Sequence, residues 1–279
     1  MKSFLNLDEL TATLRNYPVR LGLCVNFDGK IFYGYHADEP FDSACAIKSF
    51  ILLEYTRQLF DGRLSGKELI TYNEENTATG SGIVKFLPFG GQVRAEDAVE
   101  LMIALSDHVA TNLLIDLLGI DAINKTIEHH GFLNTKLKKK FLIPKVTNVG
   151  TCSPADYVNF FTALKNNQLI CAAACEFMRK IFLKQKYKDI LTEKFHLLDV
   201  ASFFIDVASK SGKADGRIYD YFAQSYIVDG GIIYTTKGSY EIALFTEIDH
   251  NSALSLSQVK SFIQDISVNF FSMFLEEKS

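Results

Sequence analysis

The sequence lacks the two features that would take the chain into or across a membrane. No uninterrupted apolar stretch approaches the roughly 20 residues that a transmembrane helix needs. The N-terminus has no basic region followed by an apolar core, since Asp8 and Glu9 stand where a signal peptide needs hydrophobic side chains. We therefore expect a cytosolic (cytoplasmic) protein with no membrane partner.

Cysteine is scarce, and its positions show no tight pairing. The five cysteines are Cys24, Cys45, Cys152, Cys171 and Cys175. An odd number without tight spacing favours reduced thiols over a disulfide framework. Cys171 and Cys175 lie in an apparently helical stretch, and without a second ligand pair their spacing favours burial over metal binding. We expect no metal site and no cofactor.

The chain also lacks an excess of positive charge. Its formal net charge of −4 gives no reason to expect a nucleic-acid partner. One basic run is the exception, and it contains Lys136, Lys138, Lys139, Lys140 and Lys145. Blocks of like charge usually face water, so a solvated loop is the favoured interpretation. A groove for an anionic substrate is the alternative.

No repeat, low-complexity tract or Pro/Ser-rich linker divides the 279 residues, which predicts one folding unit with a large core. Runs rich in Val, Leu, Phe and Tyr at 20–26 and 30–35 flank Asp28-Gly29. This dipeptide signals a hairpin because it accepts the positive φ angles of a tight turn. Three more strands are predicted at 205–209, 224–234 and 239–248.

Helical spacing of apolar residues marks the middle of the chain. The predicted helical segments are 45–61, 95–118, 120–131, 153–165 and 168–185, with a final amphipathic helix at about 253–276. Strands at both ends of the chain imply that the termini pair in one sheet. The predicted fold class is therefore α/β (α+β), with a five-stranded antiparallel sheet flanked by helices and an all-helical lobe. 

We expect residues 1–279 to form a single domain of two lobes. The sheet lobe would comprise about 1–42 and 200–279, and the helical lobe about 43–199. The cleft between two lobes is the natural place for a site.

Cys45 and Lys48 are the first candidate site residues. Their spacing of three puts the thiol and the ammonium on one helical face. A helix N-terminus and a neighbouring cation both stabilise a thiolate, and a desolvated Lys48 can act as a base. Alone, the pair is a weak signal, because a buried inert cysteine is the default.

Two further segments are also weak signals of function when each is taken alone. Ser106-Asp107-His108 favours a helix cap, because Ser and Asp prefer the first positions of helices. Lys210-Ser211-Gly212 follows the apolar strand 203–208 and is typical of a strand end with a turn.

Together, in this order and at these separations, the three segments resemble the S-x-x-K, S-D-N and K-T-G elements of serine β-lactamases and penicillin-binding proteins. Four further segments look like the class A group, and the similarity runs from about Arg20 to Glu247. These segments are 37–41, 80–83, 106–114 and 229–232. The resemblance implies a β-lactamase/transpeptidase-like fold with a cysteine in place of the nucleophilic serine.

The resemblance also implies a role for each catalytic candidate. Cys45 takes the place of the nucleophile and would be acylated. Lys48 would be its base, and Ser106 would relay a proton to the leaving group. Lys210, with Ser211, would bind a substrate carboxylate and tune Ser106.

The remaining site candidates would bind the substrate. The backbone N–H groups of Cys45 and Lys213 would form the oxyanion hole, where negative charge develops in acyl transfer. Asn112 would hold the loop under the site. His108 stands where the family usually has an asparagine that contacts the acyl side chain, so we expect substrate recognition, with a catalytic histidine as the alternative.

The sequence departs from the class A pattern at two places that affect chemistry. Cys45 would form a thioester, which is primed for transfer to an amine as well as to water. Class A enzymes also place a deacylating glutamate before the helix start that Thr151-Cys152-Ser153-Pro154 resembles. No acidic residue lies between Glu128 and Asp156, so efficient β-lactam hydrolysis is not expected.

The leading hypothesis is a β-lactamase-like hydrolase or acyltransferase that acts on an amide or ester bond. Its partner would be a small intracellular substrate bearing a carboxylate, which Lys210 could bind. A glutaminase-type activity is a variant of this hypothesis, because glutaminases share the fold. The alternatives are a true β-lactamase or penicillin-binding protein, and a catalytically inactive binding protein, against which the presence of Lys48, Ser106 and Lys210 argues.

Overall fold

The computed structural model describes residues 4–141, 148–198, 201–216 and 224–278. Lys145, one member of the predicted basic run, lies outside them. The central element is an antiparallel sheet in the order β2-β1-β11-β10-β8. Its strands are β1 (Arg20–Phe27), β2 (Lys30–Tyr35), β8 (Phe204–Ser209), β9 (Gly212–Ala214), β10 (Gln224–Thr235) and β11 (Gly238–Asp249).

The predicted five-stranded sheet is confirmed, with one refinement at its edge. β8 and β9 both pair with β10, β8 opposite Gly231 to Thr235 and β9 opposite Tyr226 to Val228. They occupy one edge of the sheet in succession, and Lys210 and Ser211 lie at the break between them. Pairing of β1 with β11 joins the two ends of the chain, as predicted.

Two hairpins connect strands of the sheet. The predicted turn at Asp28 and Gly29 joins β1 to β2, and both residues have positive φ angles, 52° and 81°. The longer β10–β11 hairpin turns at Thr236 and Lys237. Because these turns are short, the register of the four strands is set locally.

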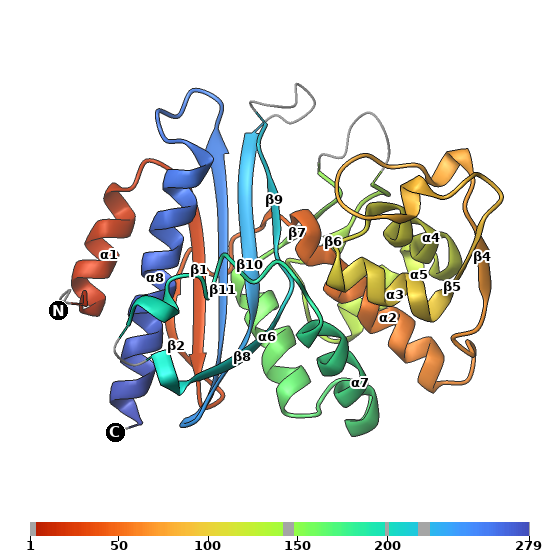
Figure 1. Cartoon of the computed structure of the whole chain (residues 1–279). Helices are drawn as coiled ribbons and strands as arrows, with labels where there is room; N and C mark the ends of the chain where they lie inside the picture. Colours follow the sequence, from red (N-terminus) through yellow and green to blue (C-terminus); the bar gives the residue numbers. More distant parts are fainter. Residues whose placement is uncertain (1–3, 142–147, 199–200, 217–223, 279) are drawn as a thin grey trace.

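Helices cover both faces of the sheet (Figure 1). On one face, α1 (Leu7–Asn16) and α8 (Leu256–Glu277) lie side by side. On the other face, α6 (Pro154–Lys165) packs against β1, β10 and β11. Each face therefore has its own apolar core. No helix among the described residues is long and apolar enough to span a membrane.

Most of the helices lie on the α6 side, away from α1 and α8 (Figure 1). They are α2 (Lys48–Phe60), α3 (Ala95–Ala104), α4 (His108–Leu118), α5 (Ile120–His129) and α7 (Ala172–Leu183). Short strands connect and border them, namely β3 (Phe41–Asp42), β4 (Leu69–Thr71), β5 (Gln92–Arg94), β6 (Lys136–Leu137) and β7 (Gly150–Cys152). α6 falls within the predicted helical lobe of residues 43–199, yet it packs on the sheet. The single domain of two lobes with these boundaries stays a prediction.

The predicted helical segment 95–118 is wrong as one continuous element. It is two helices, α3 and α4, separated by Leu105, Ser106 and Asp107. Ser106 has a φ of 55°, which no helix continues through. The side chain of Asp107 then accepts from the backbone N–H of Ala110 and caps α4, in agreement with the cap expected at this position.

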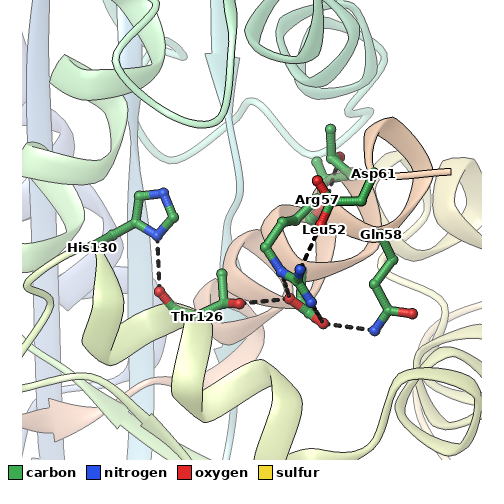
Figure 2. A network of polar contacts seen from close by, with 8 residues as sticks. Leu52, Arg57, Gln58, Asp61, Thr126 and His130 are labelled. Atoms are coloured by element: carbon green, nitrogen blue, oxygen red, sulfur yellow. Dashed lines mark hydrogen bonds and ion pairs between the residues drawn. The ribbon is translucent and has the colours of Figure 1, made fainter. Parts of the chain in front are cut away.

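A buried polar network fastens α2 to α5 (Figure 2). The carboxylate of Glu54, which is fully buried, accepts two hydrogen bonds from Arg57 at 2.7 Å each. It also accepts from Thr126 on α5 at 2.6 Å and from Gln58 at 2.6 Å. A buried charge is stable only with such partners, so the network holds α2 in place against α5.

Candidate active site

Cys45 lies in a turn of 3₁₀ helix, Ala44–Ile47, directly before α2. The predicted helical segment 45–61 implied that Cys45 belongs to α2, but Cys45 lies before this helix. The backbone N–H of Ser43 donates to the carbonyl of Gly150 at 3.1 Å, which ties this turn to β7. The half-buried thiol faces a cavity of about 610 Å³. This volume lies within the range of small-molecule sites.

Lys48 is fully buried at the first position of α2. Its ammonium donates to the carbonyl of Ser106 at 2.7 Å and to the Ser106 hydroxyl at 3.1 Å. Burial lowers the pKa of Lys48, although the negative charges of Cys45 and Asp107 oppose the shift. A lysine with a lowered pKa can exchange a proton more readily at neutral pH.

Lys210 reaches the same hydroxyl from the sheet. It is fully buried, and it donates to the Ser106 Oγ at 3.0 Å and to the carbonyl of Ser211 at 2.6 Å. Burial and the nearby positive charge of Lys48 lower the pKa of Lys210 to about 7, against the attraction of the Cys45 thiolate and Asp229. The structure thus brings both predicted lysines onto Ser106.

Ser106 owes its position to an unusual backbone conformation. Its φ of 55° is in the left-handed region, which places the residue between α3 and α4 with its hydroxyl toward the two lysines. The Ser81 hydroxyl donates to the Ser106 carbonyl at 2.7 Å. Strained backbone of this kind gathers at functional sites.

The electrostatic surroundings favour the thiolate of Cys45. Burial raises the pKa of the Cys45 thiol. The charges of Lys48 and Lys210 and a hydrogen bond with His108 lower it more, so the pKa lies well below its usual value. Since the thiolate is the nucleophilic form of cysteine, these surroundings raise the reactivity of Cys45.

The expected oxyanion position also has suitable geometry. Among the described residues, no hydrogen-bond acceptor is recorded for the backbone N–H of Cys45. A Cβ atom at Gly212 would come within 2.6 Å of that nitrogen, so β9 can approach Cys45 this closely only with glycine there. Lys213 follows Gly212 on β9 and lines the cavity.

The predicted substrate-binding residues all line the cavity: His108, Ser211, Gly212 and Lys213. Lys213 is exposed, whereas Ser211 is buried and its hydroxyl donates to the carbonyl of Tyr187 at 3.0 Å. A second lysine, Lys85, also lines the cavity. Lys213 and Lys85 therefore line the cavity, whereas the fully buried Lys210 lies behind Ser106 and does not line it.

Two side chains hold the loops that carry the cavity walls. Asp107 accepts from the backbone N–H groups of Ile83 and Val84 at 2.6 and 2.9 Å. Asn112 accepts from the backbone N–H of Phe141 at 2.8 Å and donates to its carbonyl at 2.9 Å. Asn112 thus anchors a cavity-lining loop, as expected of it.

Sequence reasoning missed several cavity residues, which come from segments without a helical or strand pattern. They are Thr79, Ser81, Phe141, Tyr187 and Asp189. Tyr187 and Asp189 follow α7, where the sequence shows no periodicity. The hydrogen bond from Ser211 to the Tyr187 carbonyl brings this segment to the site, and nothing in the sequence announces it.

The basic run does not form a groove among the described residues. Lys136, Lys138 and Lys139 are exposed, and none of them lines the cavity. Lys140 forms an ion pair with Asp116. These positions fit the solvated loop.

Burial was expected for both Cys171 and Cys175, and only one of them is buried. Cys175 is buried and Cys171 is exposed, because Cys171 precedes the first turn of α7. Within the ranges that the structure describes, no group of three or more His, Cys, Asp or Glu side chains could hold a metal ion.

Comparison with known protein families agrees with this geometry. Residues 7–272 match the family described as the beta-lactamase enzyme family. The chain belongs to that family. No curated protein sequence matches it significantly.

Solved structures show the same fold. The β-lactamase from Sphaerobacter thermophilus has a TM-score of 0.80 and 25% identity, with 95% of this chain and 93% of that chain covered. A PBP-A variant solved as an acyl-enzyme complex with penicillin G has a TM-score of 0.78 and 20% identity, covering 98% and 100%. The chromosome-encoded β-lactamase of Vibrio parahaemolyticus has a TM-score of 0.78 and 18% identity, covering 96% and 98%.

Proposed function

We propose that this member of the β-lactamase family is an amide- or ester-bond hydrolase or acyltransferase that works through a Cys45 thioester. The observation that carries the proposal is the position of the Cys45 thiol. It opens onto the cavity, and the charges of the buried Lys48 and Lys210 favour its thiolate. A thiolate with a nearby proton-transfer chain is the arrangement that nucleophilic catalysis requires.

The substrate that fits best is a small molecule with a carboxylate. Lys210 is buried under the cavity wall, and Lys213 and Lys85 stand at its surface. A carboxylate near Lys210 would also favour the protonated form of its amine, whose pKa is about 7. The charge of the substrate would therefore set the protonation state beside Ser106.

The hydrogen bonds around Ser106 indicate what its hydroxyl can do in the proposed reaction. Lys48 and Lys210 fill the acceptor positions of the Ser106 hydroxyl, which leaves its proton free to be donated. Ser106 could thus donate a hydrogen bond toward the leaving group of the reacting bond. The N–H groups of Cys45 and Lys213 would stabilise the oxyanion.

A true β-lactamase is the second candidate, favoured by the family itself and by the neighbouring β-lactamase structures. The lack of an acidic residue between Glu128 and Asp156 supports the broader acyl-transfer proposal instead. Without a carboxylate at the position of the class A glutamate to activate water, an opened β-lactam would leave Cys45 slowly. An inactive binding protein would need neither the lowered thiol pKa nor two buried lysines on one hydroxyl.

Intact-protein mass spectrometry tests the proposal. The protein is incubated with panels of amides, esters and β-lactams, and an acyl adduct is expected on Cys45 with at least one class. A Cys45→Ala variant should form none, whereas Cys171→Ser, which changes an exposed cysteine outside the cavity, should behave like the wild type. Full ligand binding by Cys45→Ala, together with no adduct and no turnover in the wild type, would mark a receptor.

A further inference from the structure

The imidazole of His108 lies against the nucleophile. Its Nε2 is 3.6 Å from the Cys45 Sγ, within hydrogen-bond range for sulfur. His108 is the first residue of α4, and both side chains line the same cavity. A substrate carbonyl bound at Cys45 would therefore also meet the His108 ring.

The other ring nitrogen shows which tautomer faces the thiol. The His108 Nδ1 lies 2.7 Å from the backbone carbonyl of Thr79. A carbonyl oxygen can only accept, so Nδ1 carries the proton in this hydrogen bond. In the neutral ring Nε2 is then the acceptor for the Cys45 thiol proton, and once it holds that proton it donates to the thiolate, which is the hydrogen bond that lowers the thiol pKa.

The loop around Thr79 is shaped to receive this ring. Gly80 has a φ of 91°, and a Cβ there would lie 2.7 Å from the His108 Cε1. The backbone N–H of His108 donates to the carbonyl of Ser81 at 3.2 Å. Phe141 packs on another side, with the two ring centroids 4.9 Å apart. Three contacts thus orient the imidazole, namely the hydrogen bond to the Thr79 carbonyl, the close approach of Gly80 and the packing of Phe141.

We propose that Cys45 and His108 form a catalytic dyad, in which His108 takes the thiol proton and delivers it to the leaving group. This inference rests on the proposed acyl-transfer function and names its acid–base residue. Lys48 then stabilises the thiolate by its charge while its ammonium donates to the carbonyl and hydroxyl of Ser106, and Ser106 supplies a hydrogen bond rather than the transferred proton.

The acylation step balances through His108 alone. The Cys45 Sγ–H proton moves to Nε2, and the thiolate attacks the substrate carbonyl carbon to form a C–S bond. The π electrons of the carbonyl move to its oxygen. When they return, the C–N bond breaks, and the leaving amine takes the proton from Nε2. A thioester and neutral His108 remain.

Deacylation reverses these roles. With the amine gone, Nε2 accepts a proton from a water molecule or an acceptor amine, whose oxygen or nitrogen attacks the thioester carbonyl. The C–S bond breaks, the Cys45 thiolate leaves, and the proton on Nε2 restores the starting pair. Since a linear amide releases its amine, the space beside His108 becomes free for this acceptor.

Rates on two substrate classes distinguish a dyad from a merely orienting histidine. His108→Gln should lose about 10²- to 10⁴-fold in kcat/KM on an amide, whose amine needs a proton to leave. It should lose much less on an activated ester of the same acyl group, whose leaving group needs none. Added imidazole should restore amide turnover to His108→Ala. Equal losses on both substrates without rescue would overturn the proposal.

His130 provides a matched control. Its Nδ1 also bonds a backbone carbonyl, that of Thr126 at 2.9 Å, and it does not line the cavity. Figure 2 shows this bond beside the Glu54 network. His130→Gln should leave both rates unchanged.

An NMR measurement tests the dyad without turnover. The ¹⁵N-edited imidazole spectrum of the whole protein should show His108 either as the Nδ1–H tautomer or as imidazolium, and its signals should shift when iodoacetamide alkylates Cys45. A neutral Nε2–H tautomer would overturn the dyad. The absence of any acyl adduct on the wild type, with the Nδ1–H signal present, would instead overturn the proposed acyl-transfer function and leave the pairing supported.

Discussion

Lys48 and Lys210 donate to the same oxygen atom, the Oγ of Ser106, from 3.1 and 3.0 Å. One lysine comes from α2 and the other from the edge of the sheet, so the hydroxyl joins the two halves of the site. Burial, with a smaller contribution from the repulsion between the two ammonium groups, lowers the pKa of Lys210 to about 7. Near neutral pH the site therefore holds one readily lost proton.

Cys45 should be the most reactive of the five cysteines toward iodoacetamide at pH 7. Burial raises the pKa of Cys24 to about 12 and also raises those of Cys152 and Cys175, whereas that of Cys45 is lowered. Peptide mass mapping measures the labelling rates. Lys48→Met should slow labelling of Cys45 and leave that of the exposed Cys171 unchanged. Faster labelling of Cys171 than of Cys45 would contradict an activated nucleophile.

A penicillin that reacts should stay attached to Cys45 for long periods. The opened ring keeps its amine tethered beside the thioester, and no carboxylate of 129–155 is available to activate water. The measurement is the lifetime of the adduct by intact mass after removal of free drug. Rapid, sustained turnover of a chromogenic cephalosporin would restore the β-lactamase interpretation.

Lys210→Ala should lower kcat/KM much more than it weakens ligand binding. In the proposed mechanism the ammonium attracts the substrate carboxylate in both ground and transition states, whereas its effect on Ser106 acts only in the transition state. We expect a loss of about 10²- to 10⁴-fold, as for other acid–base groups. Steady-state kinetics and calorimetry of a substrate analogue measure the two quantities. Equal effects on both would reduce Lys210 to a binding residue.

Lys210→Met should stabilise the fold, most strongly at low pH. Below pH 7 the amine is charged in the folded and unfolded states, so folding bears the full cost of burying the charge. Between the folded pKa of about 7 and the unfolded value of 10.5, the unfolded state binds more protons, and wild-type stability rises with pH. The gain should be on the order of a few kcal/mol at pH 6 and smaller at pH 9. Denaturant unfolding at both pH values checks the sign.

Glu54→Ala should destabilise the protein without altering the chemistry of the thiol. It leaves Arg57, whose side chain is 24% exposed, without its buried partner. We expect a loss of about 2–4 kcal/mol, moderated because solvent reaches Arg57. Thermal unfolding measures this loss, and the rate of Cys45 alkylation at 25 °C serves as the control. A matching fall in alkylation would show that the network also shapes the site.

Much of this architecture could be predicted because it depends on local patterns. Runs rich in Val, Leu, Phe and Tyr predicted the first strands of the sheet, and Asp28-Gly29 predicted its first hairpin with the observed positive φ angles. The short strands were not predicted, since elements of two or three residues carry no period, and the ten-residue helix α1 was missed as well. The break between α3 and α4 depends on the left-handed conformation of Ser106, which tertiary hydrogen bonds stabilise.

The site was predictable where motif spacing mattered and unpredictable where loops meet. Cys45, Lys48, Ser106 and Lys210 converge as the spacing indicated, although their catalytic roles stay predictions. The Thr79 carbonyl and the Tyr187 carbonyl are backbone atoms, which leave no mark in a sequence of side chains. The cytosolic location and the carboxylate-bearing substrate also stay predictions.

The left-handed backbone of Ser106 sets stability against activity at a single position. A non-glycine residue in this region costs roughly 1–2 kcal/mol relative to the right-handed conformation. Glycine would remove that strain, but it would also remove the hydroxyl that links the two lysines. A search for heat-resistant variants of this protein would therefore tend to select against the hydroxyl at position 106, and screens for thermal stability should hold that residue constant.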